Sequence, residues 1–207
     1  MTAPAQLPAE PLRESDVDPD PLVQFGRWFE RAREVVRLPE AVALATADPN
    51  GRPSVRMVLL RGWDTDGFTF HTDYDSRKAG ELIANPRGAL LLHWDILGRQ
   101  IRIEGPVEEA TAEESDRYFN SRPRDRQIAA HASDQSRPIG SREKLDQKVD
   151  EVTAEYEGRP VPRPGSWGGF RLRPESYEFW QGRDDRLHDR LLYTSSGDGW
   201  EIERLQP

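Results

Sequence analysis

The chain has 207 residues, of which 35% are hydrophobic and 32% are charged, and its net charge is −8. This length suffices for one large domain or two small ones with a buried core. The acidic balance argues against a general nucleic-acid binder, because a phosphate backbone needs a net basic face. An anionic ligand must therefore bind to a local group of basic side chains.

Cysteine is absent from the sequence, which excludes disulfides, thiolate nucleophiles and cysteine-based metal sites and fits a cytoplasmic protein. No apolar stretch approaches the roughly 20 residues of a membrane span, so we expect no membrane insertion. Residues 1–19 are rich in proline and acidic residues and lack the basic and apolar regions of a signal peptide. We therefore expect a disordered tail over residues 1–19 and a single domain over residues 20–207.

The first half of the chain contains mostly strand signals between two helices. Asp20 followed by Pro21 is typical of a helix start, and apolar residues recur at helical spacing over 21–36. The sequence DPNG predicts a turn between two strands within residues 41–63. Beyond this pair we expect a strand over 67–73, a helix over 76–84 with a serine cap, and strands over 87–95 and 99–110.

The second half begins with helices and returns to strands. Thr111 and Glu114 match a capping box at the start of the helical segment 111–133, which Pro123 should divide into two helices. A third helix is predicted over 141–158, followed by a proline-rich connector. Strands are expected within residues 167–182 and 191–205.

This order of elements predicts the fold class. Most strands follow one another through short turns and do not alternate with helices, so a parallel nucleotide-binding sheet is disfavoured. We expect a mainly β protein with helices (α+β), in which an antiparallel barrel or sandwich carries packed helices. The last strands should return to the same sheet and so complete one domain.

No familiar catalytic motif is present, and the four histidines lack metal-ligand spacing. Instead, arginines lie beside hydroxyl, amide or aromatic side chains at four places. Each place alone is more typical of solvated surface arginines, but four together favour a site for phosphorylated ligands. The places contain Arg56 and Arg61; Ser76, Arg77 and Lys78; Tyr118 and Arg122; and Arg186, His188 and Arg190.

For two of these places the sequence also predicts how the side chains are arranged. Arg56 and Arg61 stand at opposite ends of one apolar strand and face opposite sides of it unless a bulge intervenes. The helix expected to start near Ser76 offers backbone N–H groups beside Arg77 and Lys78. Such a helix start attracts phosphate groups.

Seven segments, in order and spacing, resemble the pyridoxamine 5′-phosphate oxidase family: RMVLLR, SRKAGEL, RQIRIEG, YFNSRPRDRQIAAHASDQS, WGGFRL, EFWQG and RLHDR. The resemblance extends over about residues 20–207. It implies an antiparallel split β-barrel that binds FMN and forms a homodimer with FMN at the interface. Neither the flavin nor the dimer follows from composition or periodicity.

The resemblance also implies roles for individual residues. Arg186 and His188 match the pair that closes over the substrate ring, and Gln135 and Ser136 match a pair contributed across the dimer. The implied substrate contacts are Arg61, Tyr118, Arg122, Arg126, Arg186 and His188. The implied FMN contacts are Arg56, Met57, Val58, Leu59, Leu60, Arg61, His71, Thr72, Arg77, Lys78, Gln100, Gln135, Ser136, Trp180 and Arg190.

Three departures from the family pattern concern the substrate side of the site. Arg61 stands where the family usually has lysine, and Arg126 stands where it usually has a small hydroxyl residue. The N-terminal segment also lacks the family's arginine-and-tyrosine stretch that folds over the active site. Binding of FMN is therefore better supported by the sequence than the identity of the substrate.

The function implied by the resemblance is FMN-dependent oxidation of pyridoxamine or pyridoxine 5′-phosphate to pyridoxal 5′-phosphate by O₂, with release of H₂O₂. One alternative is a related flavin oxidase that acts on another ring system, such as a dihydrophenazine carboxylate. A second alternative is a flavin- or heme-binding protein without turnover, against which the presence of both Arg186 and His188 argues. No metal ion is expected.

Overall fold

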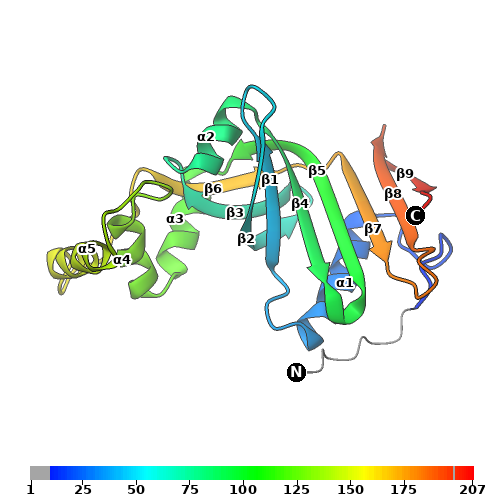
Figure 1. The fold of residues 1–207 in the computed structure, drawn as a ribbon, viewed down its shortest axis with the longest axis horizontal. Helices are drawn as coiled ribbons and strands as arrows, with labels where there is room; N and C mark the ends of the chain where they lie inside the picture. Colours follow the sequence, from blue (N-terminus) through cyan, green and yellow to red (C-terminus); the bar gives the residue numbers. More distant parts are fainter. Residues whose placement is uncertain (1–9, 198) are drawn as a thin grey trace.

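A closed antiparallel barrel forms the centre of the protein (Figure 1). The computed structural model describes residues 10–197 and 199–207. In the sheet, the strands follow the order β4-β1-β2-β3-β6-β5-β7-β8-β9, and a further pairing of β4 with β5 closes the barrel. The expectation of an antiparallel barrel with packed helices is therefore confirmed.

The strands of the sheet lie close to the expected segments. Three of them, β7, β8 and β9, extend the sheet from β5 beyond the closed barrel. The strands are β1 (Ala41–Ala47), β2 (Pro53–Asp64), β3 (Gly67–Asp73), β4 (Arg87–Trp94), β5 (Arg99–Glu109), β6 (Trp167–Leu172), β7 (Ser176–Gln181), β8 (Asp189–Ser196) and β9 (Gly199–Arg204).

The helices also follow the sequence signals. Thr111 and Glu114 form the expected capping box, and the chain is non-helical at Arg122 and Pro123 between two helices. In the described residues no helix is long and apolar enough to cross a membrane. The helices are α1 (Pro21–Val35), α2 (Arg77–Ala84), α3 (Ala112–Ser121), α4 (Arg124–Ala132) and α5 (Arg142–Glu155), and the short 3₁₀ helix η1 is Asp95–Leu97.

Helix α1 anchors the main hydrophobic core. The Asp20 side chain caps it by accepting a hydrogen bond from the backbone N–H of Leu22. Phe25 is fully buried, and its ring packs edge-on against Phe68 of β3, with centroids 4.9 Å apart. Burying an aromatic side chain of this size removes much apolar surface from water, which holds the helix on the barrel.

A second, smaller core connects α3, α4 and α5 to the barrel. Phe119 of α3, Ile128 of α4, Val161 and Trp167 of β6 form a buried cluster. In Figure 1 these helices project from the side of the barrel opposite to β8 and β9. Helix α5 contributes no fully buried residue, so it only covers the outer side of this cluster.

Residues 12–18, here called the N-terminal strap, pack against the C-terminal strands. Leu12 is buried in the main core, and the Tyr193 hydroxyl donates to the Asp18 carbonyl at 2.9 Å. The expected disordered tail over residues 1–19 therefore differs from the structure at residues 10–19; residues 1–9 lie outside the described residues. Acidic composition suggested disorder, but acids of the strap pair with arginines of the folded chain.

Gly105 of β5 lies directly against the backbone of the segment that follows β6. A Cβ atom added there would lie 1.9 Å from the backbone carbonyl oxygen of Arg173, which cannot move without shifting the chain. We predict that Gly105→Ala lowers the free energy of unfolding by about 2 kcal/mol or more. Gly62→Ala in β2, where nothing lies within 4 Å, is the matched control. Urea unfolding of both variants measures the difference, and equal effects would contradict the packing argument.

Candidate functional site

A pocket of about 420 Å³ lies between the barrel and the helical segment. Strands β2 and β3 form one wall, and α2, α3 and α4 supply side chains around it. We call it the arginine pocket. Its lining residues are Met57, Val58, Leu59, Arg61, His71, Thr72, Lys78, Tyr118, Arg122, Arg126, Gln135 and Trp167.

The arginine pocket gathers positive charge without counterions. Within the described residues, none of Arg61, Lys78, Arg122 and Arg126 forms an ion pair, although most other arginines of the chain do. Like charges held together repel one another, and partial burial strengthens this repulsion. The pocket is therefore suited to an anionic ligand.

Lys78 lies where β3 runs into the start of α2. Its ammonium group donates to the Thr72 hydroxyl at 2.8 Å, the Ser76 hydroxyl at 3.2 Å and the Gln135 side-chain oxygen at 2.6 Å. Burial, assisted by the charge of Arg56, lowers the pKa of Lys78 to about 8. A cation beside hydroxyl groups and a helix N-terminus can bind a phosphate group.

Aromatic rings form the other end of the pocket. His71 stacks on Tyr118 with centroids 4.1 Å apart and on Trp167 at 5.3 Å. The guanidinium of Arg122 lies 4.6 Å from the Trp167 ring centroid, and that of Arg61 lies 5.8 Å from Tyr118. These cation–π contacts hold the two arginines in place and leave their charge without an anionic partner.

Three buried polar atoms at this end have no hydrogen-bond partner in the described residues. They are both ring nitrogens of His71 and one terminal nitrogen of Arg122. Burial, followed by the charges of Arg122 and Arg61, lowers the pKa of His71 to about 4, so the ring is neutral near pH 7. Unpartnered buried polar groups are costly, which is typical of a site that a ligand completes.

Arg56 and Arg77 do not line the arginine pocket. Both bind the buried carboxylate of Glu81, at 3.2 Å from Arg56 and 2.8 Å from Arg77. A register shift between Leu60 and Gly62 interrupts the pairing of β2 with β3. Leu60 itself is buried in the core. Of the FMN contacts implied on β2, the pocket therefore contains Met57, Val58, Leu59 and Arg61 but neither Arg56 nor Leu60.

The remaining expected residues form a second group on β5, β7 and β8. Gln100 pairs with Trp180, and Trp180 pairs with Arg190, across adjacent strands. The His188 ring packs on Trp180 with centroids 4.6 Å apart. None of these residues lines the arginine pocket, and Figure 1 shows β7 and β8 on the other side of the barrel from α3.

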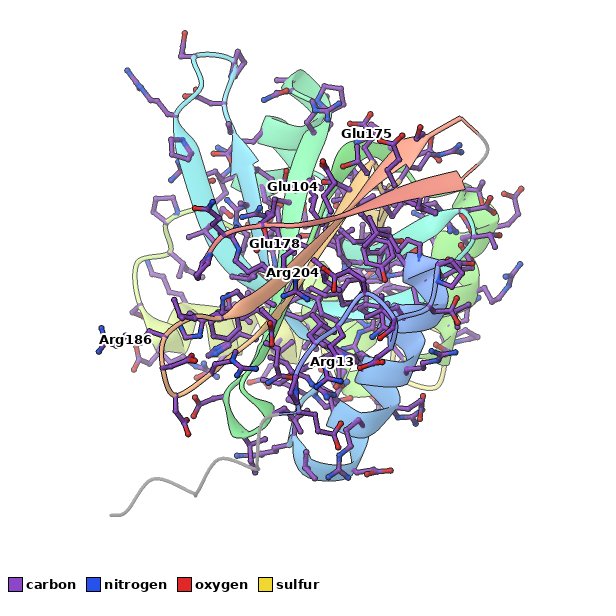
Figure 2. The ribbon with its side chains drawn as sticks, turned by 90° about the vertical axis from the view of Figure 1, so that its right-hand side faces the viewer. Arg13, Glu104, Glu175, Glu178, Arg186 and Arg204 are labelled. Carbon is purple, nitrogen blue, oxygen red and sulfur yellow. The ribbon has the colours of Figure 1, made fainter. Side chains whose placement is uncertain are left out.

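Residues 182–190, here called the charged hairpin, carry His188 and Arg186. His188 Nδ1 accepts a hydrogen bond from the backbone N–H of Arg183 at 3.0 Å, which leaves Nε2 free to act as a donor in the neutral ring. Arg186 has a positive φ of 62°, and its side chain points away from the protein (Figure 2). Within one chain, Arg186 therefore does not reach the arginine pocket.

Gln135 and Ser136 bind to their own chain. Gln135 accepts hydrogen bonds from Thr72 and Lys78, and Ser136 accepts one from the Arg77 backbone N–H at 3.3 Å. The expected role of the pair across a dimer stays a prediction. The segment after α4 folds back over the start of α2, which brings Gln135 to the arginine pocket and Ser136 to the backbone of Arg77.

Three residues of the site were not expected from the sequence. Trp167 lines the pocket, Glu81 binds Arg56 and Arg77, and Glu178 binds Arg190 at 2.7 Å. For Trp167 a signal existed, because the residue opens the WGGFRL segment. The two glutamates resemble any other acidic residue in a chain with 37 of them.

The structure is that of an antiparallel-barrel protein with a positively charged pocket. Two family models match the chain: "Pyridoxamine 5′-phosphate oxidase" over residues 29–156, and "Pyridoxine 5′-phosphate oxidase C-terminal dimerisation region" over residues 167–207. The chain therefore belongs to the pyridoxamine 5′-phosphate oxidase family, which supports an oxidase activity.

Individual relatives agree with this membership. A pyridoxine/pyridoxamine 5′-phosphate oxidase of Rubrobacter xylanophilus is 56% identical, over 95% of this chain and 91% of the relative. One from Nostoc sp. is 51% identical, over 96% of this chain and 94% of the relative. Both alignments extend over nearly the full length of this chain and of the relative.

Solved structures support the fold. PhzG from Burkholderia lata 383, in complex with tetrahydrophenazine-1-carboxylic acid, superposes with a TM-score of 0.90 at 35% identity, covering 96% of this chain and 99% of that chain. A pyridoxamine 5′-phosphate oxidase-related, FMN binding protein from Nostoc punctiforme has a TM-score of 0.71 at 19% identity, covering 88% of this chain and 95% of that chain. The second likeness concerns the fold alone.

The neutral state of His71 gives a pH prediction. Its folded-state pKa of about 4 lies below the ordinary value of 6.5, so the unfolded chain binds a proton first as the pH falls. The free energy of unfolding should therefore decrease between pH 6.5 and pH 4, and His71→Phe should reduce that decrease. Urea unfolding at a series of pH values measures it. His93→Phe, at an exposed position of β4, is the control, and equal slopes for both variants would contradict the prediction.

Proposed function

We propose that the protein is an FMN-dependent oxidase that converts pyridoxine or pyridoxamine 5′-phosphate to pyridoxal 5′-phosphate. The alcohol and O₂ give the aldehyde and H₂O₂, and the amine additionally consumes water and releases ammonia. The observation that carries the proposal is the positive charge of the arginine pocket, which no carboxylate of the described residues pairs with. Both ring nitrogens of His71 and one terminal nitrogen of Arg122 also lack a hydrogen-bond partner there. Family membership and relatives named for this reaction support it.

In this proposal the two ends of the pocket take the phosphate groups of two different ligands. Lys78, Thr72 and Ser76 at the start of α2 would hold the phosphate of FMN. Arg61, Arg122 and Arg126 would hold the phosphate of the substrate. Bound FMN would accept a hydride from the C4′ carbon of the substrate and transfer electrons to O₂.

The chain's own groups orient the substrate in this proposal. Arginine binds a phosphate through two parallel N–H groups, so Arg61 and Arg122 fix its position as well as its charge. Tyr118 and Trp167 hold these arginines and exclude water from one side of the site. His188, with Nδ1 accepting from the Arg183 N–H, presents Nε2–H as a donor to a substituent of the substrate ring.

The reaction site requires a second chain. The charged hairpin and the arginine pocket do not meet within one chain, yet the proposed mechanism needs both. The family model over residues 167–207 is described as a dimerisation region, and it includes the charged hairpin. A homodimer would therefore place Arg186 and His188 of one chain at the pocket of its partner.

A second candidate function follows from the likeness to PhzG. That protein is 35% identical and is solved with a tetrahydrophenazine carboxylic acid. A carboxylate could occupy the arginine pocket in place of a phosphate, but it carries one negative charge. Three unpaired arginines match a phosphate dianion better, which favours the vitamin B6 phosphate.

An oxygen-consumption and peroxide assay separates the candidates. We expect the FMN-loaded protein to release H₂O₂ with pyridoxine 5′-phosphate and pyridoxamine 5′-phosphate, and to react slowly with a dihydrophenazine carboxylate. A reverse order of rates would support the second candidate. A yellow protein that is inert with all three compounds would contradict both oxidase proposals and indicate a flavin carrier.

Mixing two inactive variants tests whether a site is shared between chains. Arg122→Leu damages the pocket, and Arg186→Leu damages the charged hairpin, so each variant alone should be nearly inactive. Random pairing of the two gives heterodimers with one intact site, so activity should recover to about a quarter of the wild-type value. The measurement is peroxide release after co-refolding. No recovery, with both variants dimeric and FMN-bound, would show that each chain builds its own site.

A further inference from the structure

Arg204 of β9 joins three parts of the chain that are distant in sequence. Its Nε and one terminal nitrogen donate to the Glu14 carboxylate at 2.7 and 2.9 Å. The same terminal nitrogen donates to the Leu12 carbonyl at 2.8 Å, and the other donates to Asp189 at 2.8 Å. The guanidinium therefore connects the N-terminal strap to the charged hairpin.

Asp189 is the point of the charged hairpin that receives these contacts. One carboxylate oxygen accepts from Arg204. The other accepts from the Leu12 backbone N–H at 3.2 Å and from Arg183 at 3.3 Å. Asp189 directly follows His188, and Arg183 holds the His188 ring through its backbone N–H. Any displacement of Asp189 is therefore transmitted to the histidine.

The contacts at the tip of the charged hairpin are local: the Arg186 N–H donates to the Arg183 carbonyl at 3.1 Å, and the Leu187 N–H donates to the Asp185 carboxylate at 3.0 Å. In the described part of the chain, the side chains of Asp184 and Arg186 form no hydrogen bond or ion pair, and Leu187 is 65% exposed. Arg186 also adopts a left-handed backbone conformation, which is unfavourable for a residue with a side chain. These local contacts shape the loop, whereas the contacts of Asp189 at its base join it to the N-terminal strap and to β9.

We propose that Arg204 is a positioning residue: it clamps the N-terminal strap onto Asp189 and so fixes the charged hairpin that carries Arg186 and His188. The proposal rests on the proposed function, because it treats the hairpin as part of the site. The N-terminal strap is itself attached to the folded chain at both of its ends. Leu12 is buried, and Asp18 accepts from Tyr193 and pairs with Arg27 at 2.7 Å.

The clamp has a defined effect on turnover. A ring that must approach the reacting atoms loses rate when it is held loosely, and a misplacement of about 1 Å can cost about a hundredfold. The clamp lies away from Lys78 and the start of α2, so it should not affect the phosphate-binding end of the arginine pocket. Asp189 directly precedes Arg190, an implied FMN contact, so bound FMN must be measured as well. Loss of the clamp should reduce turnover per bound FMN.

The test compares four full-length variants, of which Arg204→Lys retains the positive charge. Arg204→Leu removes the whole clamp, and Glu14→Gln weakens only its exposed part, which keeps the fold if the first variant is unstable. Arg173→Leu is the matched control, because Arg173 forms a similarly exposed pair with Glu108 at 2.7 Å away from the hairpin. Hydrogen–deuterium exchange of residues 182–190 is measured in each, together with kcat, KM and bound FMN.

We expect Arg204→Leu to accelerate exchange in residues 182–190 and to lower kcat/KM, normalised to bound FMN, about tenfold. Arg204→Lys should restore part of the exchange protection and part of kcat/KM. Unchanged exchange in this segment, or an equal change in Arg173→Leu, would overturn the proposal. Exchange is read without substrate, so the clamp can be established or rejected even if the vitamin B6 phosphates prove not to be substrates.

Discussion

The site depends on positive charge that the chain leaves uncompensated. Arg61, Lys78, Arg122 and Arg126 share one pocket in a protein of net charge −8, and in the described residues no carboxylate pairs with them. Their mutual repulsion opposes folding, and aromatic contacts offset only part of it. An anion bound there would reduce the repulsion, and any ligand that binds only the folded chain stabilises it.

Buried carboxylates decide which arginines remain available. Glu81 accepts hydrogen bonds from Thr46 and Ser54 and pairs with Arg56 and Arg77, and this network lowers its pKa to about 2. These two arginines are thereby committed to the structure around α2. Lys78, which has only neutral partners, keeps its charge available. Arg190 and Arg186 differ in the same way. Arg190 is paired with Glu178, whereas Arg186 of the charged hairpin pairs with no carboxylate of the described residues.

Short sequence patterns predicted the helices and strands well. They did not predict side-chain positions that depend on contacts between distant segments. The capping box at Thr111 and the break near Pro123 depend on neighbouring residues, so the sequence contains them. The direction of Arg56 depends on Glu81, which lies on another element. The burial of Leu60 accompanies a bulge whose cause lies in the pairing of β2 with β3. Neither follows from spacing along one strand.

The N-terminal strap shows why composition alone misjudges order. Ordering each residue costs roughly 1–2 kcal/mol of backbone entropy, which a proline-rich acidic segment rarely recovers from its own apolar surface. This strap recovers it from the folded chain, because Leu12 enters the core and Glu14 meets Arg204. Arg204 also binds Asp189, beside His188. The order of the strap and the order of the charged hairpin are therefore coupled, since both depend on the same guanidinium group.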